Sequence, residues 1–288
     1  MATLSDPPYP KEYMNVPKLY VCDGCFQCSK TVKSWERHVT RCRLLLRPPG
    51  EEVYRNDEKK IFVQKVDGEE DKRLCTDFCR LIMAFLTEKD VYRETIAFEF
   101  FIVYEMVEGN QPFRPVGYFC KQKLKFAVNL SCFCVFPCYQ KRSYGHFIIH
   151  FSYILSHLAG YPGGPEEPLS PYGKLAYCSY WKRTVVLYLH NHFVVEKKTR
   201  IPSIKDAVNC TGMIAKDIQD VLKALFPPTG DGSGRIGLSP GLVAALAEKE
   251  MEKDKAKIYP CLENVSEKFV KELREAKRFI DIYGRDFV

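Results

Sequence analysis

The chain has 288 residues, 46% of them hydrophobic, which is enough to bury a sizeable core as one large domain or as two to three small ones. A formal net charge of +7 suits an acidic partner but is too mild to establish nucleic-acid binding. A membrane protein and a secreted one are not predicted, because no apolar run is long enough to cross a bilayer and the opening MATLSDPPYP lacks the features of a secretory signal.

Cysteine is unusually frequent, with 13 residues. An odd count in a chain of this size argues against a disulfide framework, so reduced thiols are predicted, most of them packed as small apolar side chains. The Pro-rich residues 1–17 are expected to be loosely ordered.

The first strong motif has metal-ligand spacing. Cys22 and Cys25 are separated by two residues, and His38 and Cys42 by three. A tight turn at Asp23-Gly24 and a short helix over 32–40 would bring these side chains together around a tetrahedral Zn²⁺. Four protein ligands close the coordination shell, so the ion would be structural and not catalytic.

One neighbouring residue leaves the ligand set open, because Cys28 could replace Cys25. A sequence-specific DNA reader is an alternative for the finger, but a single finger rarely suffices for that. We therefore expect a scaffold role.

Strands and one helix follow the finger. Residues 53–66 indicate two strands around Asn56-Asp57, and residues 75–86 indicate a helix with an apolar stripe. Cys75 and Cys79 on that stripe have i, i+4 metal spacing, but no further ligand lies near them in the sequence, which favours core packing. Further strands are predicted over 97–106, 117–126 and 130–136.

The stretch NLSCFCVFPCYQKRSYG, residues 129–145, joins a buried strand to a helix through a basic turn. Pro137 ends the strand, and a helix is predicted over 146–158. The free N–H groups at a helix start favour an anion, and Lys141 and Arg142 add positive charge. The turn contains neither GxxxxGK[ST] nor GxGxxG, so an ordinary strand-to-helix connection is the alternative.

The C-terminal part reads as mainly helical. A Gly/Pro loop over 161–168 precedes a helix over 175–189 with Trp181 on its buried side. Ser203 and Asp206 form a helix-capping signal, and Thr211-Gly212 separates two helices. His146 and His150 have metal spacing without an evident third ligand, so a helix surface is predicted for them.

The stretch around Cys132 resembles motif A of the MYST family of lysine (histone) acetyltransferases. That family has a strand Cys, then Pro-x-Tyr-Gln and a Gly-containing turn, matched here by Cys132, 137–140 and 140–145. Family signatures are also matched over 47–55, 146–153, 165–170 and 179–181. The resemblance runs from about residue 19 to about residue 189.

The resemblance implies an α/β (α+β) fold with a GNAT-like acetyl-CoA-binding core, an N-terminal zinc finger and a C-terminal helix-turn-helix-like segment. The expected boundaries are 1–17 for the loosely ordered N-terminus, 18–60 for the finger and linker, 61–190 for the catalytic core and 191–288 for the C-terminal segment.

The resemblance also implies the chemistry. Acetyl transfer requires a lysine ammonium to lose its proton, and by family matching the general base is Glu166. Cys132 would lie beside the thioester, where a thiolate could form an acyl-enzyme. We favour direct attack by the lysine in a ternary complex, with Cys132 lining the site.

The family pattern assigns acetyl-CoA contacts to the strand, the turn and two downstream serines. These residues are Phe133, Cys134, Val135, Gln140, Lys141, Arg142, Ser143, Tyr144, Gly145, His146, Ser170 and Ser179. Ser143 departs from the pattern, because the family has Gly there. If the backbone at Ser143 needs a positive φ, the side chain costs about 1 kcal/mol or more and could weaken cofactor binding.

The same resemblance implies a modified lysine and the kinds of partner. Lys89 aligns with the family's autoacetylated lysine, with a surface lysine as the alternative. Expected partners are histone tails or the nucleosome, regulatory subunits of a chromatin complex and a weak DNA contact, with the nucleus as location and no membrane. The second hypothesis is a catalytically weak or inactive chromatin-binding module, and the third is a zinc-finger DNA-binding protein without chemistry.

Overall fold

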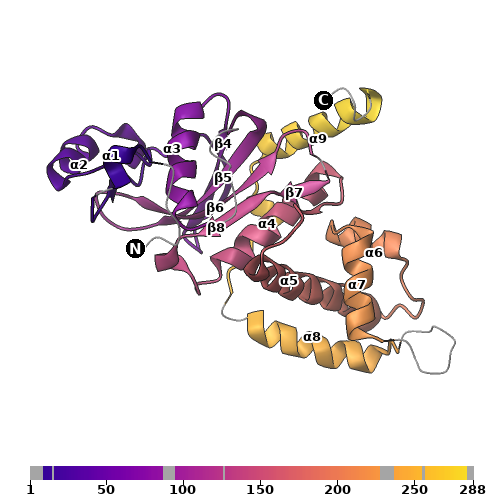
Figure 1. Ribbon diagram of the computed structural model, residues 1–288. Coiled ribbons are helices and arrows are strands. Elements are labelled where there is room, and N and C mark those ends of the chain that lie inside the picture. The colour runs from indigo at the N-terminus through magenta and orange to yellow at the C-terminus, as the bar shows by residue number, and fades with distance from the viewer. Residues whose placement is uncertain are drawn as a thin grey trace. The chain divides into compact units, whose positions relative to one another are not determined.

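Figure 1 shows the computed structural model, which describes residues 9–14, 16–86, 95–125, 127–227, 237–254 and 257–283. The chain folds into two compact units. The first comprises Met1–Leu124, Ser131–Gly145 and Glu263–Phe269, and the second comprises Lys125–Leu130, His146–Leu262 and Val270–Val288.

A five-stranded antiparallel sheet is the centre of the first unit, with the strand order β3-β4-β5-β6-β8. Its strands are β3 Glu51–Asn56, β4 Ile61–Asp67, β5 Phe98–Met106, β6 Phe113–Gln122 and β8 Cys132–Val135. The β4–β5 register is unbroken from Ile61↔Glu105 to Asp67↔Glu99. The two strands predicted over 53–66 are therefore confirmed, with their turn between Asn56 and Ile61.

Helix α3 (Lys72–Met83) covers one face of this sheet (Figure 1). Its fully buried Phe78 meets Tyr118 edge to face at 5.1 Å between ring centroids. Cys75 and Cys79 are buried in the same apolar cluster. The predicted stripe is thus confirmed, and the two thiols pack as small apolar side chains.

The other face of the sheet is covered by aromatic contacts. Phe101 and Phe119 stack with centroids 4.6 Å apart, and Phe269, near the start of α9 (Glu267–Tyr283), lies 6.2 Å from Phe101. Lys268 makes an ion pair of 2.6 Å with Glu51 of β3. The chain thus returns to the sheet near its C-terminal end, where Phe269 packs on this second face.

The zinc-finger region of the same unit contains short elements. These are α1 Lys11–Met14, β1 Tyr20–Val21, β2 Cys28–Ser29, α2 Val32–Val39 and a 3₁₀ turn at Arg43–Leu45. Strands β1 and β2 pair antiparallel, and the Trp35 indole donates a hydrogen bond of 3.0 Å to the Val21 carbonyl oxygen. The predicted helix over 32–40 is confirmed.

The strand predicted over 130–136 is confirmed as β8, residues 132–135, but its start is not, because the chain divides at Ser131 into two strands with different partners. Strand β7 (Val128–Leu130) pairs parallel with β9 (Gly164–Pro165), whereas β8 pairs antiparallel with β6. The Ser131 N–H donates to the Cys120 carbonyl, and the Leu130 carbonyl accepts from the Glu166 N–H. The backbone groups on the two sides of the division thus have different partners, which an apolar run does not reveal.

Helices dominate the second unit. They are α4 Tyr144–Ala159, α5 Pro171–His190 with a π-helical extension Asn191–Val195, α6 Ile204–Thr211, α7 Ala215–Leu225 and α8 Pro240–Asp254. Helix α5 contacts α6, α7 and α8 (Figure 1). Trp181 on α5 is half-buried and donates to the Tyr153 hydroxyl of α4 at 2.7 Å.

The predicted helix pair after residue 203 is confirmed. Ser203 and Asp206 form a capping box at the start of α6. Gly212 ends the helix with φ of +69°, the left-handed conformation that glycine adopts without cost. Among the described residues, none of the helices has both the length and the apolar character to cross a membrane.

The surface position predicted for His146 and His150 is confirmed only in part, because both residues are half-buried on α4. The Nδ1 atoms of both rings are buried and lack a hydrogen-bond partner among the described residues. Burial, with Arg183 nearby, lowers the pKa of His150 to about 4, although Asp254 opposes the shift. Burial and Lys257 likewise lower the pKa of His146. Burial thus disfavours the charged form of both rings.

These histidines predict loss of stability in mild acid. In the unfolded chain His150 has a pKa near 6.5. Its contribution to the free energy of unfolding is therefore fully present above about pH 6.5. It declines as the pH falls toward about 4, by on the order of 3 kcal/mol. Urea unfolding of wild type and His150→Phe across this range measures the effect. The wild type should lose more stability than the variant, and parallel pH curves would contradict the expectation. The comparison also cancels the opposite contribution of Asp217, whose pKa is raised.

Candidate functional site

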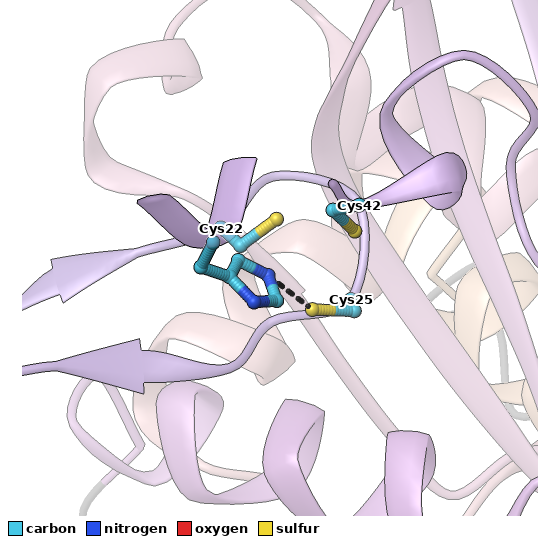
Figure 2. Close-up of side chains that lie close together, drawn as sticks. Cys22, Cys25 and Cys42 are labelled. Carbon is cyan, nitrogen blue, oxygen red and sulfur yellow. Dashed lines mark hydrogen bonds between the residues drawn. The ribbon is translucent and has the colours of Figure 1, made fainter. Parts of the chain in front are cut away.

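The clearest cluster of chemical groups is formed by Cys22, Cys25, His38 and Cys42, whose ligand atoms all lie within 4.8 Å of one another. Figure 2 shows the three cysteine side chains gathered around a common centre. Cys25 Sγ and His38 Nε2 are 3.2 Å apart. A hydrogen bond from the Cys22 thiol lowers the pKa of Cys25 and raises that of Cys22.

This geometry fits a zinc ion. Tetrahedral Zn²⁺ with bonds of about 2.3 Å to sulfur and about 2.0 Å to nitrogen separates its ligand atoms by roughly 3.5–3.8 Å. Among the described residues, the group that could hold a metal includes Cys25 and not Cys28. The four side chains offer three thiolates and one imidazole, the donor set of a structural zinc site.

The local sequence explains why these ligands meet. A Cβ atom at Gly24 would lie 2.6 Å from the Leu44 carbonyl carbon. Only glycine therefore fits where the Cys22–Cys25 turn, here called the knuckle, packs against the backbone of residues 44–45. Thr31 caps α2 by accepting a hydrogen bond from the Ser34 N–H. Phe26 leaves the knuckle with φ of +60° and packs 4.3 Å from Phe78 of α3.

The basic turn after β8 contains two residues in the left-handed backbone region, Lys141 with φ of +63° and Ser143 with φ of +68°. The backbone at Ser143 therefore does need a positive φ, and a non-glycine residue costs about 1 kcal/mol or more there. The Gln140 amide donates to the Val135 carbonyl at 3.2 Å, which ties the turn to the strand. The Arg142 guanidinium lies 5.6 Å from the centre of the Tyr139 ring.

Gly145 stands in open space at the start of α4. Its φ is not in the left-handed region, and a Cβ atom built on it would meet only Val135 Cγ2, at 4.0 Å. Neither backbone conformation nor internal packing requires glycine here. A ligand approaching the first amides of the helix would need this space, so the turn fits a phosphate group.

Buried side chains flank this turn. Tyr144 is buried, and burial together with the Glu105 carboxylate raises the pKa of its phenol.

Cys132 and Cys134 lie in the apolar cluster beneath α3, whereas Phe133 and Val135 alternate to the other face and are half-buried. Cys132 faces Cys120 across the β6–β8 ladder. Its side chain is 6% exposed, as expected of a strand cysteine and little exposed for a nucleophile.

Glu166 belongs to the second unit and directly follows β9. Its backbone N–H donates to the Leu130 carbonyl at 2.9 Å, which fixes the start of the loop. Its carboxylate is one quarter exposed and lies 3.3 Å from Lys125 Nζ. The adjacent Glu167 is exposed and pairs with Lys216 at 3.2 Å. The two neighbouring acids are therefore in different environments.

The remaining predicted cofactor residues are distributed over helices. Ser170 is the N-cap of α5 and accepts a hydrogen bond of 3.2 Å from the Gly173 N–H, and Ser179 is exposed on the same helix. His146 belongs to the first turn of α4. Thus the structure brings the four metal ligands together, and it places Cys132 and the turn in the first unit and Glu166, Ser170 and Ser179 in the second. Lys89 lies outside the described residues.

Three polar residues near the Glu166 segment were missed by sequence reasoning. They are Lys125, Asn129 and Asp217. Asn129 and Asp217 are buried with side-chain atoms that lack partners among the described residues. Asn129 is a single polar residue in an apolar run, and Asp217 lies in a charged helical stretch that reads as solvent-exposed, so neither position gives a signal of what its side chain will face.

An antiparallel sheet unit with a Cys₃His finger, joined to a helical unit, defines a zinc-finger protein with a GNAT-like α/β core. Residues 47–261 match the MOZ/SAS family, and residues 1–42 match the MYST family zinc finger domain. The chain therefore belongs to the MOZ/SAS (MYST) family, as the resemblance predicted.

Three similar proteins illustrate the relationship. The chain is 37% identical over 219 residues to Histone acetyltransferase KAT6B of Homo sapiens, 36% over 219 to Histone acetyltransferase mst2 of Schizosaccharomyces pombe and 37% over 219 to Putative MYST-like histone acetyltransferase 1 of Oryza sativa subsp. japonica. Each match covers 76% of this chain but only 10%, 51% and 46% of the respective relative. The chain thus spans between a tenth and a half of the length of these proteins.

The metal cluster predicts that Cys22→Ser removes zinc and lowers the melting temperature, because one missing ligand opens the coordination shell and loosens Phe26 from its packing on Phe78. Elemental analysis should fall from one zinc per chain to near zero. Cys28→Ser is the matched control and should keep the metal. A folded wild-type protein purified without zinc would contradict the assignment.

Proposed function

We propose that this chain is a histone lysine acetyltransferase that transfers an acetyl group from acetyl-CoA to a lysine side-chain amine. The observation that carries the proposal is the family match over 47–261, which includes both the basic turn and the Glu166 segment. The open space at Gly145 and the cations Lys141 and Arg142 support a phosphate-bearing donor at the turn. We assign the donor's other contacts to the strand amides of 133–135 and to Ser170 and Ser179.

Glu166 is the proposed general base. Lys125 supports this assignment, because its ammonium is the same chemical group as that of a substrate lysine and reaches Glu166 Oε1 at 3.3 Å. An ammonium at that distance is within reach for proton transfer to the carboxylate. Acetyl-CoA supplies the activated acyl group when bound. Glu166 takes the proton, the neutral amine attacks the thioester carbonyl directly in a ternary complex, and the C–S bond breaks so that the CoA thiolate leaves and is protonated.

Cys132 is proposed to line the site without forming an acyl-enzyme. Its burial in the apolar cluster and its position opposite Cys120 support this, because a nucleophilic thiol acts as thiolate and an apolar environment disfavours that charge. The basic partner in this scheme is a histone tail, which would place the protein in the nucleus. Regulatory subunits of a chromatin complex and a weak DNA contact through the finger are further proposals.

The mechanism predicts different effects of two substitutions. Glu166→Gln should lower kcat by on the order of 10²–10⁴ with acetyl-CoA and a histone peptide, because the amine keeps its proton. Cys132→Ala should reduce kcat by less than about tenfold, since only packing is lost. Glu167→Gln, the exposed neighbour, is the control and should be near wild type. A large loss in Cys132→Ala with little loss in Glu166→Gln would reverse the two roles.

A second candidate function, a chromatin-binding module with weak or no catalysis, is favoured by Ser143 alone. A serine at φ of +68° strains the turn at the proposed phosphate position. Acetyl-CoA binding distinguishes the two functions, because a ligand stabilises the native state by mass action.

The thermal shift of wild type and Ser143→Gly measures this. We expect acetyl-CoA to raise the melting temperature of the wild type, and Ser143→Gly to be more stable by about 1 kcal/mol and to bind the cofactor more tightly. Gly145→Ala is the opposing variant, because its methyl group fills the open space before the helix and should weaken cofactor binding. A wild type without any shift would favour the binding module.

A further inference from the structure

The segment Gly163–Glu166, here called the Glu166 loop, is held along both sides by backbone hydrogen bonds. On the side of β7, the Gly164 N–H donates to the Ala127 carbonyl at 3.0 Å and the Glu166 N–H to that of Leu130 at 2.9 Å. On the side of α7, the Gly163 N–H donates to the Gly212 carbonyl at 2.9 Å. The loop is thus fixed between a strand and the α6–α7 turn.

Two buried polar side chains contact the two glycines of this loop. A Cβ atom at Gly163 would lie 2.9 Å from Asn129 Cβ and 2.7 Å from Ser156 Oγ. At Gly164 it would lie 3.4 Å from Asp217 Oδ2. Asn129 is 2% exposed and Asp217 4%. The loop therefore has a polar side chain from β7 against one glycine and one from α7 against the next.

The polarity of these two side chains is not explained by packing. Both amide atoms of Asn129 and the Oδ2 atom of Asp217 are buried without a hydrogen-bond partner among the described residues. A buried unsatisfied polar atom costs about 1–3 kcal/mol, and an apolar side chain of the same shape would contact the glycines without that cost. Unsatisfied buried polar groups are rare in native proteins, and a functional role is one explanation for them.

We propose that Asn129 and Asp217 are positioning residues that hold the Glu166 loop in its catalytic position. The proposal rests on the proposed role of Glu166 as the base. Neither side chain reaches solvent, so they act through the backbone of Gly163 and Gly164 and not on the substrate. Displacement of a base by about 1 Å can cost up to about 100-fold in rate, which is the scale on which such residues matter.

The charge state of Asp217 adds a pH dependence. Burial raises the pKa of Asp217 to about 6, with Lys216 opposing the shift and Glu167 and Asp220 reinforcing it. The phenols of Tyr153 on α4 and Tyr177 on α5 also face this carboxyl. Because the pKa of Asp217 is higher in the folded protein than in the unfolded chain, Asp217 adds to the free energy of unfolding below about pH 4, and this contribution is lost as the pH rises through about 6. The carboxyl against Gly164 thus changes charge near pH 6.

The test compares Asp217→Ala and Asp217→Asn in steady-state kinetics. Asp217→Ala should lower kcat by about tenfold or more while the KM for acetyl-CoA stays within about twofold. Asp217→Asn keeps the shape without the ionisation, so it should restore most of kcat and remove the inflection near pH 6 from the pH profile of kcat. Asp220→Asn, which removes an exposed acid on the same helix, is the matched control: it should keep the kcat of wild type and move the inflection only slightly downward, because Asp220 reinforces the raised pKa of Asp217.

Gly164→Ala keeps the proposal testable if Asp217→Ala does not fold. The added methyl group would lie 3.5 Å from Ile214 Cδ1 and 3.4 Å from Asp217 Oδ2, the tight limit of ordinary contact, so the variant should fold while the loop and the Asp217 carboxyl move apart by a few tenths of an ångström. It should lower kcat severalfold without changing the KM for acetyl-CoA. An unchanged kcat in Gly164→Ala, or in a folded Asp217→Ala, would overturn the proposal.

Glu166→Gln, measured in the same series, separates the two proposals. If Glu166→Gln loses activity while Asp217→Ala and Gly164→Ala keep theirs, the positioning role fails and the base assignment stands. If Glu166→Gln keeps full kcat, both fail. A lower melting temperature in Asp217→Ala with wild-type kcat and pH profile would reveal a purely structural role and would also overturn the proposal.

Discussion

The division of the backbone at Ser131 determines much of the remaining structure. Buried backbone groups must find hydrogen-bond partners, and here the Leu130 carbonyl bonds to the Glu166 N–H while the Ser131 N–H bonds to the Cys120 carbonyl. One short stretch of chain therefore forms two strand pairs: β7 pairs parallel with β9 before Ser131, and β8 pairs antiparallel with β6 after it. The first fixes the loop that carries the proposed base, and the second adds to the sheet the strand that carries Cys132.

The basic turn shows an unusual distribution of glycine and serine. Gly145 occupies a position where the backbone would accept any residue, and Ser143 occupies one where the backbone favours glycine. Gly145 therefore leaves open space in front of the start of α4, whereas Ser143 holds the conformation of the turn at a cost in stability. Backbone strain of this kind persists where the surroundings determine the conformation, as the buried Tyr144 and the Gln140 amide do here.

Sequence reasoning succeeded where local patterns carry the information. The spacing from Cys22 to Cys42, the stripe on α3 and the Ser203–Asp206 cap each depend on neighbours within a few residues or on one helix face. It failed where distant partners decide. The hydropathy of residues 130–136 does not reveal that Leu130 and β8 pair with different strands, and the ring of His150 packs against Tyr180 and Tyr259, which lie far along the chain. The catalytic assignments came from family resemblance and remain proposals.

The aromatic contact between Phe26 and Phe78 makes the metal knuckle part of the sheet's interior. Phe26 is 1% exposed and belongs to the same apolar cluster as the strands beneath α3. Removal of the finger would therefore leave a cavity against Phe78 in the apolar cluster of the first unit. The stability of the sheet unit is thus coupled to metal binding by the finger.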